Sequence, residues 1–129
     1  MPYALCAGQT PSMALTGIYQ TPYPNQAGAN LITTITGTVN ANIVKGAQLK
    51  FVAYGTGSLN GVTIFNKQYD FCTTQGITCP ISSSKTAQSF TFTVPPLTTA
   101  GGVKTTFRIQ LVNADGSSVF CVADSAYML

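Results

Sequence analysis

The sequence contains no histidine, no glutamate and no tryptophan, and charged residues make up only 7% of its 129 positions. General acid–base catalysis needs side chains whose protonation changes near the working pH. The side-chain carboxylates are those of Asp70, Asp115 and Asp124. Asp115 is accounted for by a turn, and we expect the other two to be solvated at the ends of loops or strands. A nucleophilic serine or cysteine would have no evident base, so the composition predicts a protein that is not an enzyme.

Patterns for metals, cofactors and nucleic acids are missing as well. Without histidine or a Cys-x2-Cys pair, the widely spaced cysteines do not form a zinc pattern. The glycine-rich stretch 54–61 lacks the lysine and the following helix of a phosphate-binding loop. The net charge of +3 comes from scattered basic residues and not from a basic run. We therefore expect no metal, no cofactor and no nucleic-acid partner.

Long apolar runs are absent too, because no stretch approaches the roughly 18 residues of a membrane-spanning helix. The N-terminus has no charged segment followed by an apolar one, and we expect Met1 to stand where a signal peptide was removed. Length and even composition predict one domain over residues 1–129.

Four cysteines are present, at positions 6, 72, 79 and 121, and they allow three pairings. The Cys72-x6-Cys79 spacing suits a short clasp across a loop, and a bond between Cys6 and Cys121 would join the two terminal segments. Paired cysteines indicate an oxidising compartment.

Alternation of apolar and polar residues predicts strands throughout, and no segment carries a sustained helical stripe. The clearest alternations lie in the segments 31–39, 90–94 and 103–111. Weaker candidates at 12–19, 47–55, 60–65 and 117–124 raise the total to about seven strands. Turn residues separate them, and Asp115-Gly116 predicts a tight hairpin. The pattern is typical of an all-β, immunoglobulin-like two-sheet sandwich.

Large inward side chains can keep two such sheets apart and leave an apolar cavity between them, although core packing alone would also account for any single phenylalanine. The residues that alternation places inward, and that we expect to contact a ligand, are Ile35, Val39, Phe51, Ile64, Phe90, Phe92, Phe107, Ile109 and Leu111.

The segment 69–81, with its Asp70-x-Cys72 and Cys79-Pro80-Ile81 elements, resembles the ML domain family of lipid-recognition proteins. The family includes a lysosomal cholesterol carrier, mite group 2 allergens and fungal phosphatidylglycerol/phosphatidylinositol transfer proteins. The order of features agrees from about residue 6 to about residue 122, ending with Asp115-Gly116 ahead of Cys121.

The resemblance implies a non-enzymatic sandwich whose inter-sheet cavity holds a lipid ligand, namely a sterol, a phospholipid or a fatty acyl chain. It also implies secretion or delivery to the lysosomal or vacuolar lumen, and pairing of Cys6 with Cys121 and of Cys72 with Cys79. The chain departs from the animal carriers in lacking a further early cysteine pair and in its low charge.

The mouth of such a cavity should be apolar and mobile, and loops at one end of a sandwich meet this requirement. Two stretches fit by resemblance: Ile64-Phe65, and Pro95-Pro96-Leu97, although the prolines could simply terminate a strand. The second stretch lacks the aromatic residue of the sterol carrier, which favours an acyl lipid. Lys67 and Lys104 would attract the protein to anionic membranes during transient contact.

Three hypotheses remain open at this point. The first is a monomeric lipid carrier that transfers its ligand between membranes. The second is a recognition module that presents a lipid, or binds a glycan or partner protein, at the cell surface. The third is a structural cell-surface protein whose core is filled by its own side chains, which predicts no cavity.

Overall fold

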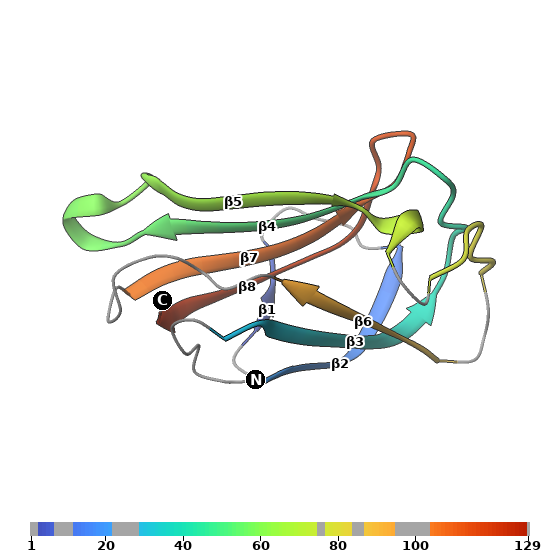
Figure 1. Ribbon diagram of the computed structural model, residues 1–129, viewed down its shortest axis with the longest axis horizontal. Helices are drawn as coiled ribbons and strands as arrows, with labels where there is room; N and C mark the ends of the chain where they lie inside the picture. Colours follow the sequence, from blue (N-terminus) through green and yellow to red (C-terminus); the bar gives the residue numbers. More distant parts are fainter. Residues whose placement is uncertain are drawn as a thin grey trace.

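The computed structural model consists of two antiparallel sheets that face one another (Figure 1). It describes residues 3–6, 12–21, 29–74, 77–83, 87–94 and 104–128. The large sheet has the strand order β1-β8-β7-β4-β5, and the small sheet has the order β2-β3-β6. The strands are β1 (Ala4–Leu5), β2 (Met13–Thr21), β3 (Leu31–Val39), β4 (Gln48–Gly55), β5 (Thr63–Asp70), β6 (Gln88–Val94), β7 (Lys104–Val112) and β8 (Ser118–Met128).

The predicted all-β sandwich is confirmed, and the described residues contain no α-helix. Two short 3₁₀ turns, η1 (Gly57–Leu59) and η2 (Phe71–Thr73), flank β5. In β3, every second side chain from Leu31 to Val39 is buried, as the alternation predicts. The same holds in β7 from Thr105 to Leu111. The hairpin predicted at Asp115-Gly116 joins β7 to β8, with Gly116 at a φ of 88°.

The strand predicted at 60–65 is placed wrongly, since β5 begins at Thr63 and continues to Asp70. Ile64 and Phe65 therefore lie in a strand and not in a loop. The polar residues Asn66, Lys67 and Gln68, which follow the predicted strand, belong to β5 as well. An edge strand tolerates them, because no further strand covers its outer edge and much of β5 is exposed to water.

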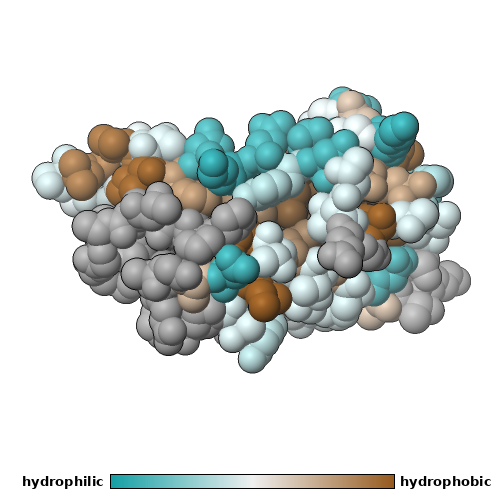
Figure 2. Space-filling model, in the orientation of Figure 1, coloured by the Kyte–Doolittle hydropathy of each residue, from teal (hydrophilic) through white to brown (hydrophobic). Residues whose placement is uncertain are grey.

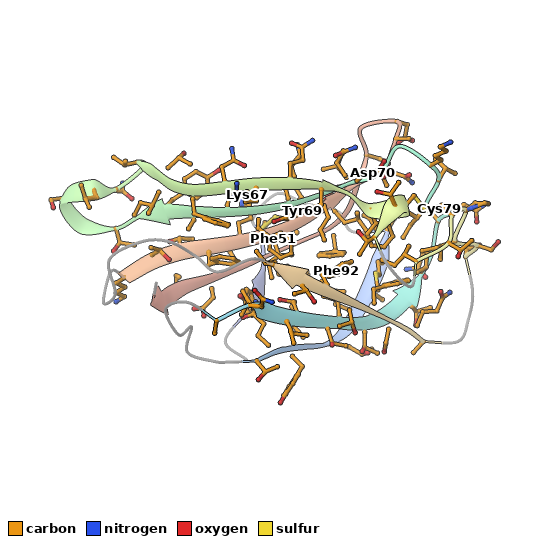
Figure 3. All side chains as sticks on the ribbon, in the orientation of Figure 1. Phe51, Lys67, Tyr69, Asp70, Cys79 and Phe92 are labelled. Atoms are coloured by element: carbon orange, nitrogen blue, oxygen red, sulfur yellow. A yellow bond between two sulfur atoms is a disulfide. The ribbon has the colours of Figure 1, made fainter. Side chains whose placement is uncertain are left out.

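The core fills the space between the sheets, and its largest fully buried side chains come from both of them. Phe51 of β4 and Phe92 of β6 project into this space from opposite sheets (Figure 3). Phe71 packs against β6 of the small sheet, because its ring lies 5.5 Å from that of Phe90 and 5.6 Å from that of Phe92. Burial of this apolar surface is the main stabilising contribution.

Both disulfides implied by the resemblance are present, and the described cysteines leave no free thiol. Cys6, at the end of β1, is bonded to Cys121 of β8, and both belong to the large sheet. Cys72 and Cys79 close a loop directly after β5. Neither bond therefore joins a strand of one sheet to a strand of the other.

One end of the sandwich, which we call the clasp end, holds the Cys72–Cys79 loop, the β3–β4 connection and the β7–β8 turn (right in Figure 1). Ser12 ties the sheets together there, since its N–H donates to Val119 O at 2.9 Å and its carbonyl accepts from Asn40 N at 2.8 Å. Ile43 and Ile81 exchange two backbone hydrogen bonds, of 2.9 and 2.8 Å. The opposite end, which we call the hairpin end, carries the β4–β5 turn (left in Figure 1).

Among the described residues, no helix has the length and apolar character needed to cross a membrane.

Candidate functional site

The inward-facing residues predicted to contact a ligand come together in one cluster between the sheets. On β3, β4, β6 and β7 they are at most 8% exposed, and they are Ile35, Val39, Phe51, Phe90, Phe92, Phe107, Ile109 and Leu111. Ile64 and Phe65 of β5 are half-buried and pack against the same cluster. The predicted mouth residues Pro95, Pro96 and Leu97 lie outside the described residues.

Aromatic rings connect the edge strand β5 to the interior. Phe65 stacks on Phe107, with ring centroids 6.5 Å apart and an interplanar angle of 22°. Phe107 also lies 6.3 Å from Phe51, and Phe51 meets Tyr69 edge-on at 6.0 Å. A path of apolar contacts thus runs from the half-buried edge of the large sheet to its buried centre.

The sequence prediction missed Tyr69 and Phe71 as parts of this cluster. Continuing the alternation of β5 for four residues beyond Phe65 would have identified Tyr69, since Phe65, Lys67 and Tyr69 share one face of the strand. Burial raises the pKa of the Tyr69 phenol above its ordinary value of 10.0, so the group stays protonated at neutral pH. Phe71 lies in a 3₁₀ turn, outside any period-two pattern.

Lys67 lies on the inner face of the large sheet. It is paired across the ladder with Phe51, and directly opposed residues in a ladder share a face. Its neighbours on that face are Phe65 and Tyr69, and Lys67 itself is exposed. Lys50, on the adjacent strand, has the opposite orientation, because it pairs with Gln68 and Gln110. From the sequence, Lys67 was expected to attract the protein to anionic membranes. Its placement on the inner face of the sheet was not predicted.

Four polar side chains are buried among the described residues: Gln20, Thr33, Thr105 and Asp124. The register of their strands places all four toward the hairpin end. Gln20 connects the sheets, since it accepts from the Tyr3 hydroxyl at 2.8 Å and donates to Thr33 Oγ1 at 3.2 Å.

The two expectations for the aspartates have different outcomes. Asp124 is only 1% exposed, so the prediction that it is solvated is wrong. It lies in the middle of an eleven-residue strand and opposite Phe107, which turns it toward the interior. Asp70 does lie at a strand end, where one carboxylate oxygen accepts from Cys72 N at 3.1 Å and begins the 3₁₀ turn.

The described residues form two pockets at the margins of the inter-sheet cluster. One, of about 200 Å³, adjoins the Cys72–Cys79 disulfide and Lys45. The other is a cleft of about 630 Å³ between the edge strands β1 and β2. None of the predicted ligand contacts lines either of them. The cleft is lined by Tyr3, Leu5, Met13, Ala14, Leu15, Thr16, Gly17, Ile18 and Val122.

Across the described segments, no group of three or more acidic or cysteine side chains could hold a metal ion. The chemistry that the arrangement supports is burial of apolar surface, with polar groups at its margins.

Comparisons with known proteins agree with this architecture. A family model described as the ML domain matches residues 1–128. A search of curated proteins found no match. Among solved structures, the chain is similar to the crystal structure of a Niemann-Pick type C2 protein from the Japanese carpenter ant. The two share 10% identity and a TM-score of 0.64 over 93% of this chain and 95% of the other, which shows a common fold.

Proposed function

The chain belongs to the ML domain family, and from this premise we propose that it binds a lipid between its two sheets and carries it between membranes, without catalysing a reaction. The observation that carries the proposal is the single apolar cluster between the sheets, which reaches the surface along the aromatic side chains of β5. Burial supplies the affinity. An acyl chain of about sixteen methylenes contributes roughly 13 kcal/mol before ordering costs, at about 0.8 kcal/mol for each methylene.

Entry of a lipid requires the sheets to separate, because the interior residues are packed against one another. The covalent structure permits this movement, since neither disulfide joins a strand of the small sheet to a strand of the large one. We propose that the sheets open at the hairpin end and remain joined at the clasp end. An interior filled by its own side chains also fits a purely structural protein, and uptake of lipid distinguishes the two.

The ligand we favour is a phospholipid with an anionic headgroup. Lys67 and Tyr69 lie two residues apart on the inner face of an edge strand, so their backbone positions are roughly 7 Å apart and this face carries both an ammonium group and a phenolic donor. These are suitable partners for a phosphate, and the neighbouring Phe65 leads from them to the core.

Membrane contact would involve the hairpin end. Leu59 and Val62 at the β4–β5 turn are 49% and 51% exposed, and apolar surface gathers at this tip in Figure 2. Thr56 of the same turn donates to Lys104 O at 3.1 Å, which places a basic residue beside it. Such a tip suits transient insertion into an anionic bilayer by a monomer in the secretory or lysosomal lumen.

Uptake by the delipidated protein tests the function. After delipidation, native mass spectrometry should detect one bound phosphatidylglycerol, and a fluorescent analogue should move from donor to acceptor vesicles faster with the protein than without it. A folded protein that takes up neither phospholipid nor sterol would exclude the proposal.

The headgroup assignment is tested with two lysines of the same sheet. Lys67→Met should weaken binding of phosphatidylglycerol by about fivefold to tenfold and leave phosphatidylcholine unchanged, because a charge-assisted hydrogen bond is lost. Lys50→Met removes the same charge from the outer face and should change neither. Equal effects of the two variants would contradict the inward role of Lys67.

A further inference from the structure

We propose that the outer face of the large sheet binds a sulfated polysaccharide. This face is formed by the outward side chains of β4, β5 and β7, with Lys50 and Arg108 at its centre. It lies on the opposite side of the large sheet from the inter-sheet cluster, so the inference does not depend on lipid binding.

The register of the large sheet brings cations together on this face. Lys50 is paired with Gln110, and Val52, two residues further along β4, is paired with Arg108. Lys50 and Arg108 are therefore diagonal neighbours, with backbone positions roughly 7–8 Å apart. The alternation of β7 places Lys104 on the same face, four residues and roughly 13 Å from Arg108. The three cations follow the direction of the strands, which suits a linear polymer.

The side-chain carboxylates are kept away from the centre of this face. Asp124 is buried opposite Phe107, on the inner side of the sheet, and Asp115 lies in the β7–β8 turn. Asp70 does share the outer face, but at its clasp-end corner, where one of its oxygens accepts from Cys72 N at 3.1 Å. The fold therefore separates the charges, and the positive face is complementary to an anionic partner.

Arg108 is positioned for a sulfate group. Its guanidinium carbon lies 5.8 Å from the centre of the Tyr54 ring, which makes a cation–π contact within the same face. The contact fixes the position of the guanidinium, whose planar fork of N–H groups can donate to two oxygens of one sulfate. The partner of Arg108 on β8 is Ala123, and its small side chain keeps that side of the guanidinium open.

The other side chains of the face favour a sugar polymer over a membrane or a protein. Lys50 lies between Gln68 of β5 and Gln110 of β7, and amide side chains both donate and accept, as sugar hydroxyls require. Membrane insertion and protein interfaces depend on exposed large apolar residues. In the described part of the chain none of these residues has an outward position on β4, β5 or β7; they are Leu5, Tyr19, Ile32, Val44, Leu59 and Val62.

The test uses a heparin tetrasaccharide, with the same sugar after desulfation as its control. Isothermal titration should detect binding of the sulfated form alone, and binding should weaken as the ionic strength rises. Lys50→Met should weaken it by about fivefold and Arg108→Gln by about tenfold, because each removes a charge-assisted contact. Lys45→Met removes the same charge from the exposed β3–β4 connection, outside the face, and should change the Kd by less than about twofold.

Several results would overturn the proposal. They are absence of binding, equal losses in all three variants, which would indicate attraction by net charge alone, and equal affinity for a single-stranded oligonucleotide of the same charge. Phosphatidylglycerol uptake should be unchanged in Lys50→Met, so failure of this proposal and failure of the proposed function are separate results.

If a variant does not fold, NMR spectroscopy of the unmodified protein decides the question. The tetrasaccharide should shift the side-chain amide signals of Gln68 and Gln110, which lie on either side of Lys50. Shifts confined to the small sheet would refute the assignment.

Discussion

The two ends of the sandwich differ in what they bury and in how they are tied. At the clasp end the fully buried residues are apolar, among them Ile43, Phe71 and Ile81, although the Ser118 hydroxyl is also buried there, and backbone hydrogen bonds through Ser12 join the sheets. At the hairpin end the four buried polar side chains gather, and a side-chain hydrogen bond from Tyr3 to Gln20 is one link between the sheets.

The difference indicates which end can open. Separating the clasp end would expose a continuous apolar surface and break backbone bonds, whereas water can satisfy the polar groups of the hairpin end when they part. We therefore expect the two sheets to separate first at the hairpin end, where local stability should be lowest, and to stay joined at the clasp end.

The largest test of this comparison concerns the disulfides. Replacing Cys6 and Cys121 with alanine should lower the free energy of unfolding by about 5 kcal/mol, because the bond closes a loop with a sequence separation of 115. Replacing Cys72 and Cys79, separated by 7 positions, should cost about 2 kcal/mol. Urea unfolding of both pairs measures the difference. The reverse order would mean that the Cys72–Cys79 bond stabilises the clasp end mainly through contacts in the folded protein, and not by restricting the unfolded chain.

A second test compares phenylalanines from the two ends. Phe71→Ala at the clasp end should cost about 3–5 kcal/mol, because its fully buried ring contacts Phe90 and Phe92. Phe65→Ala should cost about half as much, because that ring is half-buried at the edge of the sheet. Thermal unfolding gives both values, and hydrogen exchange should show faster exchange of β5 in Phe65→Ala. Equal losses of stability would contradict the contrast between the ends.

The smallest expected effect is a pH dependence confined to the clasp end. The hydroxyl and the backbone N–H of Ser117 donate to the Asp115 carboxylate and hold its pKa below the ordinary value of 3.8. Because the folded pKa is the lower one, the carboxylate stabilises the turn fully above the unfolded pKa. That contribution is lost as the pH falls through the folded pKa. Below pH 3.8, amide exchange should increase around residues 113–117 and not at the hairpin end. Asp115→Asn should remove this pH dependence, and an increase of equal size at both ends would refute the assignment.

Much of the fold could be predicted because its regular strands obey a local rule. Every second residue of β3, β6 and β7 is buried, so alternation alone identified Phe92, Phe107 and their neighbours. The disulfide pairing was implied by the family resemblance. The two-residue strand β1 was missed, since two residues carry no periodicity.

The candidate site was less predictable, because its features depend on tertiary context. Lys67 has the local sequence of a solvated loop residue, and only its pairing with Phe51 places it on the inner face. Asp124 is buried because of the length of β8, which composition does not reveal. The bulge in β2 depends on Gly37 of β3, because a Cβ atom on Gly37 would lie only 2.5 Å from the backbone of the bulged strand. No local pattern connects the two.

The outer face of the small sheet explains how a chain so poor in charge meets water. Thr34 and Thr91 share a hydrogen bond of 3.0 Å across β3 and β6, and Thr36 and Ser89 share one of 2.8 Å. Hydroxyl groups both donate and accept, and their hydration does not depend on ionisation. Colloidal stability that depends on net charge changes with acidity and ionic strength, whereas a hydroxyl surface keeps the same affinity for water. A protein covered in this way would remain dispersed when the pH of its surroundings falls.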